Sequence, residues 1–334
     1  MKILIATGIY PPEIGGPAEY ASNLARVWKK RGNEVSVKIF GKFQKYPWGI
    51  RHVIFFFYII PSVAKSDYIV TLDAFSAGVV TLASKIFNKK IVFRTGGDVL
   101  WELYTERTGD MVLLRDFYIK KQKEFSLKEK IIFSLMRWTL QNLSAIIWST
   151  EWQKNIFIKP YGLDKQKNLI VENYFGKKLP SGSYSKKNFI GGTRKLKWKN
   201  IELVKRVFET EQVKNSGSVL DLETVPHNEF LEKIRNSYAV IIASLGDISP
   251  NTIIDAITCG TPFIVTKESG LFERIKDVAI FVDPKDPKDI EEKVLWLSNE
   301  NNYKSQKQKI ESWNFVHDWD EIATEYEDIY KSIK

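Results

Sequence analysis

The chain has 334 residues, of which 44% are hydrophobic and 27% charged, and this length suggests two domains with ample buried core. Its one cysteine, Cys259, excludes a disulfide framework and a cysteine-based zinc cluster. The three histidines are scattered and show no metal-ligand spacing. The net charge of +10 is compatible with nucleic acid, an anionic membrane surface or an acidic small-molecule substrate.

The excess positive charge is confined to the first half of the chain. Residues 1–175 hold 26 lysines and arginines against 15 acidic residues, whereas residues 176–334 hold 24 against 25. A protein that binds nucleic acid along its whole length would be expected to spread this charge, and no nucleic-acid-binding motif accompanies it. We therefore predict two halves with different tasks, and no nucleic-acid partner.

Apolar segments near the start of the chain are short. Residues 1–6 are too short an apolar run for a signal peptide. The longest apolar stretch, residues 53–63, contains Pro61 and falls well below the ~20 residues that cross a bilayer. It is either a buried helix of an α/β layer or a segment that enters a membrane interface. We predict a cytoplasmic protein, with peripheral attachment to the inner face of the cytoplasmic membrane as the alternative.

Short β-branched runs alternate with helical patterns, which favours an α/β fold with parallel sheets covered by helices on both faces. The first strand leads through a glycine-containing loop into a helix from about residue 17 to residue 32. Residues 315–330 have the spacing of an amphipathic helix. The predicted strands are 2–7, 35–39, 68–72, 91–94, 145–148, 169–171, 188–191, 218–222, 239–243, 263–265 and 279–282.

The stretch 176–185, which contains Gly, Pro and Ser, separates two such alternations and is predicted to be a linker. We therefore expect two doubly wound, Rossmann-like domains that face each other across a cleft. Residues 1–175 form the first domain and residues 186–310 the second. Residues 311–334 are expected to form a C-terminal helix that crosses back to the first domain.

Several common site motifs are missing. No G-x-G-x-x-G follows the first strand and no Walker loop is present, which argues against a dehydrogenase and a P-loop enzyme. One D-x-D motif occurs, Asp318-Trp319-Asp320, but it lies in the terminal helix rather than at a strand end. We therefore expect no metal site there.

Glycines and cations stand at two strand-to-helix junctions. In the loop from Pro11 to Tyr20, the N–H groups at Gly15 and Gly16 can approach an oxyanion or a sugar, although a turn that requires positive φ explains them equally well. In the second half, Arg194 and Lys199 follow a strand. There they can clamp a diphosphate at the carboxyl edge of the sheet, unless they belong to a solvated basic turn.

Two carboxylates flank a polar turn further along the chain. Asp247 follows a predicted strand, and Asp255 lies on the helix beyond the turn. An acidic side chain on that helix is well placed to bind ribose hydroxyls. The alternative is a pair of aspartates on the surface of the protein.

In this order and at these separations, the three stretches resemble the family 4 glycosyltransferases of the GT-B fold. The family pattern runs P-P-x-x-G-G, then G-R…K, then E-x7-E followed by a G-T-P-like strand entry. Here Arg194 and Lys199 are five residues apart, and Asp247 and Asp255 are eight apart. The resemblance covers almost the whole chain, with smaller matches at residues 148–151, 171–173, 225–229 and 270–273.

The resemblance implies a retaining hexosyltransferase that needs no metal and no cofactor. It would move a sugar from a nucleotide-sugar to a hydroxyl of a glycan or lipid-linked acceptor, in the synthesis of a cell-surface polysaccharide. Donor-binding residues would be Arg194, Lys199, Asp247, Ser249, Asn251, Thr252 and Asp255. Acceptor-binding residues would be Gly15, Gly16 and Glu19, and the catalytic set Asp98, Asp247, Arg194 and Lys199.

Two departures from the family pattern keep alternatives open. Both glutamates of the paired motif are aspartates here, so the chain is alternatively a catalytically silent GT-B protein that binds sugar or joins a complex. Asp98 stands where many relatives carry a histidine, and it contacts either the sugar or acceptor, or caps the following helix. A GT-B epimerase or phosphorylase is the alternative among enzymes, although a phosphorylase would be expected to carry a pyridoxal lysine and a much longer chain.

The segment at residues 120–138 is basic and then apolar, with Phe and Trp. This composition is typical of a helix that lies in a membrane interface, and equally of a solvated helix that leads into a core. With the acceptor expected in the first domain, an anionic membrane surface is a predicted partner.

Overall fold

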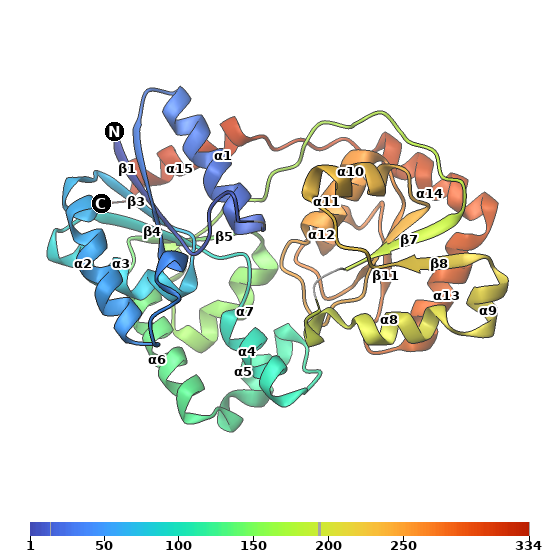
Figure 1. Cartoon of the computed structure of the whole chain (residues 1–334), viewed down its shortest axis with the longest axis horizontal. Helices are drawn as coiled ribbons and strands as arrows, with labels where there is room; N and C mark the ends of the chain where they lie inside the picture. The colour runs from blue at the N-terminus through green and yellow to red at the C-terminus, as the bar shows by residue number, and fades with distance from the viewer. Residues whose placement is uncertain (14, 193–194, 334) are drawn as a thin grey trace. The chain divides into compact units, whose positions relative to one another are not determined.

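The computed structural model describes residues 1–13, 15–192 and 195–333, which form two compact units, each built on a parallel sheet (Figure 1). The first unit holds Met1–Leu100, Phe125–Tyr174 and the end of the chain from His317. The second unit holds Trp101–Glu124 and Phe175–Val316. The chain therefore passes from one unit to the other four times.

The sheet of the first unit has the order β2-β1-β3-β4-β5-β6, with all neighbouring strands parallel. The buried β-branched residues of its central strands suit a sheet that is covered on both faces. Its strands are β1 (Lys2–Thr7), β2 (Glu34–Ile39), β3 (Tyr68–Thr71), β4 (Lys90–Arg94), β5 (Ala145–Trp148) and β6 (Asn168–Ile170).

The sheet of the second unit has the order β11-β10-β9-β7-β8 and is also parallel. Its strands are β7 (Lys187–Gly191), β8 (Ser218–Asp221), β9 (Ala239–Ile242), β10 (Phe263–Thr266) and β11 (Ile280–Val282). Each predicted strand agrees with one of these eleven to within one residue at either end. The predicted α/β fold with two Rossmann-like units is confirmed.

Helices cover both faces of the first sheet. Ile3 and Ile5 belong to a core that α1 and α15 complete, whereas the equally buried Leu4 between them faces the opposite side, toward α2 and α3. These helices are α1 (Gly16–Lys30), α2 (Ile50–Lys65), α3 (Ala74–Ile86), α6 (Leu127–Gln141), α7 (Glu151–Tyr161) and α15 (Trp319–Ser332). None of the helices in the described parts of the chain combines the length and apolarity that a membrane span requires.

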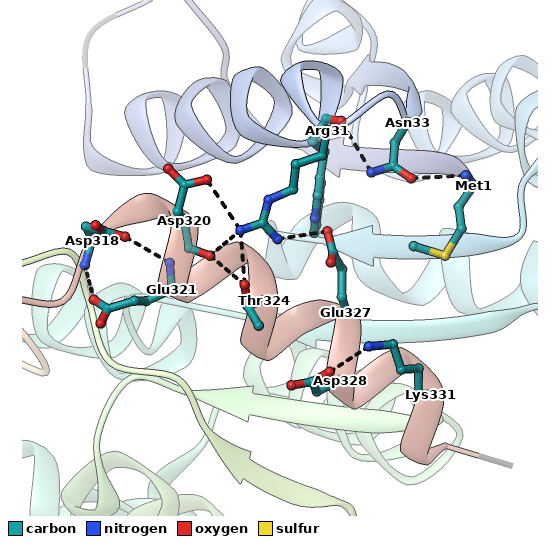
Figure 2. A network of polar contacts seen from close by, with 11 residues as sticks. Met1, Arg31, Asn33, Asp318, Asp320, Glu321, Thr324, Glu327, Asp328 and Lys331 are labelled. Atoms are coloured by element: carbon teal, nitrogen blue, oxygen red, sulfur yellow. Dashed lines mark hydrogen bonds and ion pairs between the residues drawn. The ribbon is translucent and has the colours of Figure 1, made fainter.

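Helix α15 is held against the end of α1 by polar contacts as well as by its apolar face (Figure 2). The Arg31 guanidinium donates to the carbonyl oxygen of Asp320 at 2.7 Å and to the Thr324 hydroxyl at 3.0 Å, and it lies 3.2 Å from Glu327. The Asp318 side chain accepts from the Glu321 N–H and so caps the helix. Both aspartates of the D-x-D motif therefore have structural contacts.

His317 lies buried just before α15 and joins it to the end of the first sheet. Its Nδ1 donates to the carbonyl oxygen of Asn173 at 3.1 Å, and its Nε2 lies 3.4 Å from Glu325 Oε1. Burial lowers the pKa of His317, but the Glu325 carboxylate, the Asn173 carbonyl and the Glu321 charge together outweigh burial, so that the pKa is raised.

The raised pKa predicts how the stability of the first unit varies with pH. The charged imidazole stabilises the folded unit fully below the ordinary histidine pKa of about 6.5, and this stabilisation is lost as pH rises through the raised pKa. Thermal unfolding between pH 5.5 and 8.5 should show a fall in stability that His317→Gln lacks. An identical pH dependence in both proteins would contradict this assignment.

The helices of the second unit cover both faces of its sheet, around two apolar clusters. The helices that follow its strands are α8 (Ile201–Phe208), α9 (Glu211–Asn215), α10 (His227–Arg235), α11 (Asn251–Cys259), α12 (Phe272–Ile275), α13 (Pro287–Ser298) and α14 (Glu300–Ser312). Short 3₁₀ turns, η1 (Phe40–Phe43), η2 (Gln122–Glu124), η3 (Lys165–Lys167) and η4 (Lys197–Lys199), connect elements in both units.

Residues Trp101–Glu124, here named the α4–α5 segment, belong to the second unit although chain order suggested the first. The segment holds most of α4 (Val99–Thr108) and all of α5 (Leu114–Lys121). Two contacts account for the difference. The Trp101 ring packs on that of Trp198 at 5.2 Å, and the Lys197 N–H donates to Glu106 Oε1 at 2.6 Å. Neither contact joins residues that are near in sequence.

The predicted linker, residues 176–185, contains no helix or strand in the structure. It is nevertheless fixed to the second unit. The Lys178 ammonium donates to the carbonyl oxygens of Ile257 and Ile310, close to the ends of α11 and α14. Burial lowers the pKa of Lys178 to about 8. A cation at two helix C-termini is favourable, so Lys178 ties the linker to both helices.

Candidate functional site

The sheet of the second unit reverses its strand order next to β7, whose neighbours are β8 on one side and β9 on the other. In open parallel sheets, ligands bind outside the carboxyl ends of the strands at such a switch point. A small hollow lies there. It is lined by Gly191 at the end of β7 and Gly192 after it, by Ala243 and Ser244 after β9, by Lys199, and by apolar side chains of β9 and α8.

Lys199 and Asp247, which are 48 residues apart, form an ion pair at this edge. Lys199 Nζ lies 2.6 Å from Asp247 Oδ2, and both side chains are largely buried. Ser244 Oγ donates to the same carboxylate oxygen at 3.3 Å. Asp247 is itself fixed by its backbone, which bonds to Glu268 and to Gly270. The structure therefore brings together two residues that the sequence assigned to one donor site.

Asn200 holds the turn that carries Lys199. Its backbone has a φ of 59°, in the left-handed region, and links η4 to α8. Its buried amide nitrogen donates to the carbonyl oxygen of Ala243 at 3.1 Å and to that of Pro284 at 2.6 Å. The conformation of the turn is thus tied to the loops that follow β9 and β11.

The N-terminus of α11 presents backbone donors without a capping side chain. Among the described residues, neither the Asn251 N–H nor the Thr252 N–H has a hydrogen-bond partner, and the first turn carries no acidic residue. Uncapped N–H groups and the helix dipole together favour an anion at this end. Ser249 lies in the turn just before the helix, partly exposed.

Asp255 lies one turn further along α11 and has a partner that sequence reasoning missed. Asp255 Oδ2 is 3.3 Å from Nε2 of His227, the first residue of α10. A sugar hydroxyl that approached Asp255 would share the carboxylate with this imidazole. Arg194, the other cation of the predicted donor site, lies outside the described residues.

The predicted acceptor residues lie in the first unit, around the start of α1. Gly15 precedes the helix with a φ of 155°, which side-chain-bearing residues rarely adopt, and Gly16 is its first residue. Glu19 lies in the first turn and is half-buried. As in α11, no side chain caps this helix.

Asp98 is buried in the loop between β4 and α4, and its Oδ1 accepts a hydrogen bond from the Leu100 N–H at 3.0 Å. This is the contact of a helix cap. Asp98 also lines a small hollow in the first unit, together with Thr95, Gly97 and apolar residues of α6 and α7. The Asp98 carboxylate therefore caps the helix and also lies at the wall of this hollow.

Arg94 is a buried cation that sequence reasoning did not select. It ends β4, where its Nη2 donates to Ser149 Oγ at 2.9 Å and to Asn173 Oδ1. Its guanidinium lies 3.8 Å from the centre of the Tyr20 ring. The available signal was its position at the carboxyl end of a buried strand, where binding residues often lie.

A second unpredicted pair lies beside Asp247 in the second unit. The Glu268 carboxylate is fully buried, and burial raises its pKa. Arg115 on α5 lies 3.0 Å from it, in an ionic contact without hydrogen-bond geometry. Arg115 belongs to the α4–α5 segment, so this segment supplies a cation next to the candidate site.

Gly246 provides a test of how closely the α4–α5 segment packs here. A Cβ at Gly246 would lie 2.5 Å from Leu114 Cβ, which is attached directly to the α5 backbone. Gly246→Ala should therefore displace α5 and lower the free energy of unfolding by about 1–3 kcal/mol. Gly192→Ala is the matched control, because its Cβ would meet only a side-chain atom at 3.7 Å. Equal free energies of unfolding of the two variants in urea would show that α5 can be displaced without a measurable loss of stability.

Comparison with known proteins shows which family model and which solved structures the chain resembles. Residues 184–313 match the family model described as glycosyl transferases group 1. The chain is similar over 99% of its length, and 98% of the other chain, to a sucrose-phosphate synthase from Thermosynechococcus elongatus, with 12% identity and a TM-score of 0.73. No curated protein matches the chain by sequence.

Two further solved structures are similar over nearly the whole chain. HepE from Anabaena in complex with UDP-glucose has 14% identity and a TM-score of 0.65, covering 100% of this chain and 98% of that one. The lipopolysaccharide outer core galactosyltransferase WaaB has 12% identity and a TM-score of 0.62, covering 99% of each. These likenesses confirm the GT-B fold that the sequence predicted.

Proposed function

Residues 184–313 match the family model of the glycosyl transferases group 1, and from this match we propose that the chain is a retaining hexosyltransferase. The donor is a nucleotide-sugar and the acceptor is a hydroxyl of a glycan or lipid-linked glycan. Neighbours that were solved with UDP-glucose, or that act on lipopolysaccharide, support this donor class and a role in surface polysaccharide synthesis.

One observation carries the proposal. At the switch point of the second sheet, a largely buried ammonium, that of Lys199, stands at a hollow that glycines line, and Asp247 is its partner. The nearby α11 adds two backbone donors without partners among the described residues. An ammonium and an uncapped helix N-terminus are the groups that bind and stabilise a diphosphate.

In the proposed mechanism, the bond between the anomeric carbon and the diphosphate oxygen breaks while the acceptor oxygen bonds to the same face of that carbon. The acceptor proton passes to an oxygen of the leaving diphosphate, so no protein base is required. Lys199 and Arg194 stabilise the negative charge that develops on the diphosphate, a contribution that is often the largest in such transfers. These two cations are proposed to serve in place of a metal or cofactor.

Asp247 and Asp255 have more specific roles in the proposal, and the backbone N–H groups around Ser249 approach the sugar and the phosphates. Asp247 contacts the donor sugar once the diphosphate draws Lys199 away from it, and Asp255 binds the ribose together with His227. The acceptor lies in the first unit, near Gly15, Gly16 and Glu19, and Asp98 contacts the sugar or the acceptor. Support comes from the positions of these residues at the carboxyl edges of the two sheets.

A second candidate is a catalytically silent subunit that binds sugar or joins a complex. It is favoured by the partners that two expected donor ligands already have, Asp247 for Lys199 and His227 for Asp255. The two candidates differ in whether bound donor turns over.

A donor panel separates them. Wild-type protein is incubated with UDP-, GDP- and ADP-sugars, and release of the nucleoside diphosphate is measured together with nucleotide affinity. Slow hydrolysis of one donor without acceptor supports the enzyme. Nucleotide binding without turnover of any donor, with or without added glycan acceptor, supports the silent subunit.

A further inference from the structure

The outer sides of α2, α3 and α6 expose large apolar side chains. Contacts join α2 to α3 and α3 to α6, so the three helices are neighbours along one face of the first unit (Figure 1). The exposed residues, here named the outer helical face, are Ile50, Val53 and Phe57 on α2, Phe75, Leu82 and Ile86 on α3, and Leu127, Ile131, Leu135 and Trp138 on α6.

These exposed apolar residues are not the partly covered border of the hydrophobic core. On α2, the buried side is already formed by Phe55, Ile59 and Val63, whereas Val53 and Phe57 are 57% and 67% exposed. A surface helix of a water-soluble unit normally carries polar residues on its outer side. Contiguous exposed apolar patches mark a partner or membrane surface.

The charges around the outer helical face are almost all positive. The stretches 40–65, 74–89 and 127–141 together contain nine lysines and arginines and one acidic residue, Glu129. The Glu129 carboxylate is buried and caps α6 by accepting from the Ser126 N–H. Lys85 and Lys128 are exposed and Lys89 is partly exposed, and none of the three forms an ion pair with any acidic residue that the structure describes.

We propose that the outer helical face binds an anionic lipid bilayer, independently of the proposed sugar transfer. Its apolar side chains enter the boundary between headgroups and acyl chains, and the surrounding lysines and arginines contact lipid phosphates. Apolar insertion and unpaired cations in one face are the combination that binds anionic membranes. A protein partner would require acidic complementarity and would not require lipid, and the experiment below separates the two.

The outer helical face differs from the membrane-binding segment that the sequence predicted at residues 120–138. The basic segment at residues 120–138 is not one helix, because α5 ends at Lys121 in the second unit and α6 begins at Leu127 in the first. Only α6 belongs to the outer helical face. Its inner residues Ile132 and Met136 line the hollow that Asp98 also lines. If sugar transfer occurs, the face therefore lies one helix away from a residue proposed to contact the acceptor.

The test is co-sedimentation of the full chain with vesicles of phosphatidylcholine alone and with added phosphatidylglycerol, at low and high salt. We expect binding to the anionic vesicles that weakens with salt. The variant F57S/L135S should bind them at least about tenfold more weakly, because it removes two side chains that become buried on insertion.

The matched control is V219S/W296S, which removes two side chains of the second unit that are 47% and 41% exposed and should bind like wild type. Light scattering is measured on the same samples. Absence of binding by wild type, or equal binding by F57S/L135S, overturns the proposal. Conversion of a dimer to a monomer by F57S/L135S, without vesicle binding by wild type, assigns the face to self-association instead. Donor turnover without acceptor, measured separately, reports only on the proposed function.

Discussion

Replacing Lys199 with methionine should lower donor turnover by about 10²–10³-fold, the loss typical of removing one group that stabilises developing negative charge. Lys199 Nζ is the described cation at the switch-point hollow, and methionine retains much of the bulk of its aliphatic chain. Lys199→Arg keeps the charge and should recover part of the rate. The measurement is release of nucleoside diphosphate from the donor identified in the panel. From the sequence, Arg194→Ala should abolish turnover while the fold is kept, and near-normal rates would refute that assignment.

The control is Lys205→Met, which removes a more exposed lysine of the same unit that also pairs with a carboxylate, that of Glu202. A surface pair of this kind contributes little, so turnover should be unchanged. Thermal unfolding of both variants shows whether the fold is kept. Turnover of folded Lys199→Met within about threefold of wild type would refute a role for Lys199 at the diphosphate.

Asn200→Ala should lower the free energy of unfolding by about 3–4 kcal/mol. Two buried carbonyl oxygens, those of Ala243 and Pro284, would lose their donor, at about 1–1.5 kcal/mol each. The left-handed conformation would add about 1 kcal/mol with alanine in place of asparagine. Asn200→Gly removes the same hydrogen bonds but tolerates the conformation, so it should cost less than alanine. Unfolding in urea measures the free energy of unfolding of the wild type and of both variants.

Asn88 offers a matched comparison, because it also has positive φ, at 48°, but is exposed and makes no side-chain hydrogen bond with the described residues. Asn88→Ala should cost only about 1 kcal/mol, the conformational part. Equal costs at the two positions would mean that the buried hydrogen bonds of Asn200 contribute nothing. Asn200→Ala should also reduce turnover, because it releases the turn that positions Lys199.

Most of the fold could be predicted because the strands carry local signals. A buried parallel strand such as Ala145–Trp148 is a continuous apolar run, and eleven short strand signals separated by helical patterns permit few architectures. The α4–α5 segment could not be predicted in this way. Its place in the second unit depends on Trp101 meeting Trp198 and on Glu106 meeting Lys197, and no local pattern encodes contacts between residues that far apart.

The candidate donor site was partly predictable for a related reason. Lys199 and Asp247 each follow a strand of one sheet, and parallel strands end at one edge, so both were expected there. Their direct ion pair, and the contact between His227 and Asp255, depend on side-chain geometry that motif spacing does not contain. The same holds for Asp98. Its position in the sequence suited both a ligand and a helix cap, and in the structure its side chain accepts the capping hydrogen bond.

A crystal structure of the chain with a nucleotide-sugar or its nucleoside diphosphate is the sharpest test of the proposed donor site. We expect diphosphate oxygens within about 3 Å of Lys199 Nζ and of the Asn251 or Thr252 N–H, with the Lys199–Asp247 ion pair lengthened. Nucleotide bound away from the carboxyl edge of β7 and β9, with this ion pair unchanged, would contradict it.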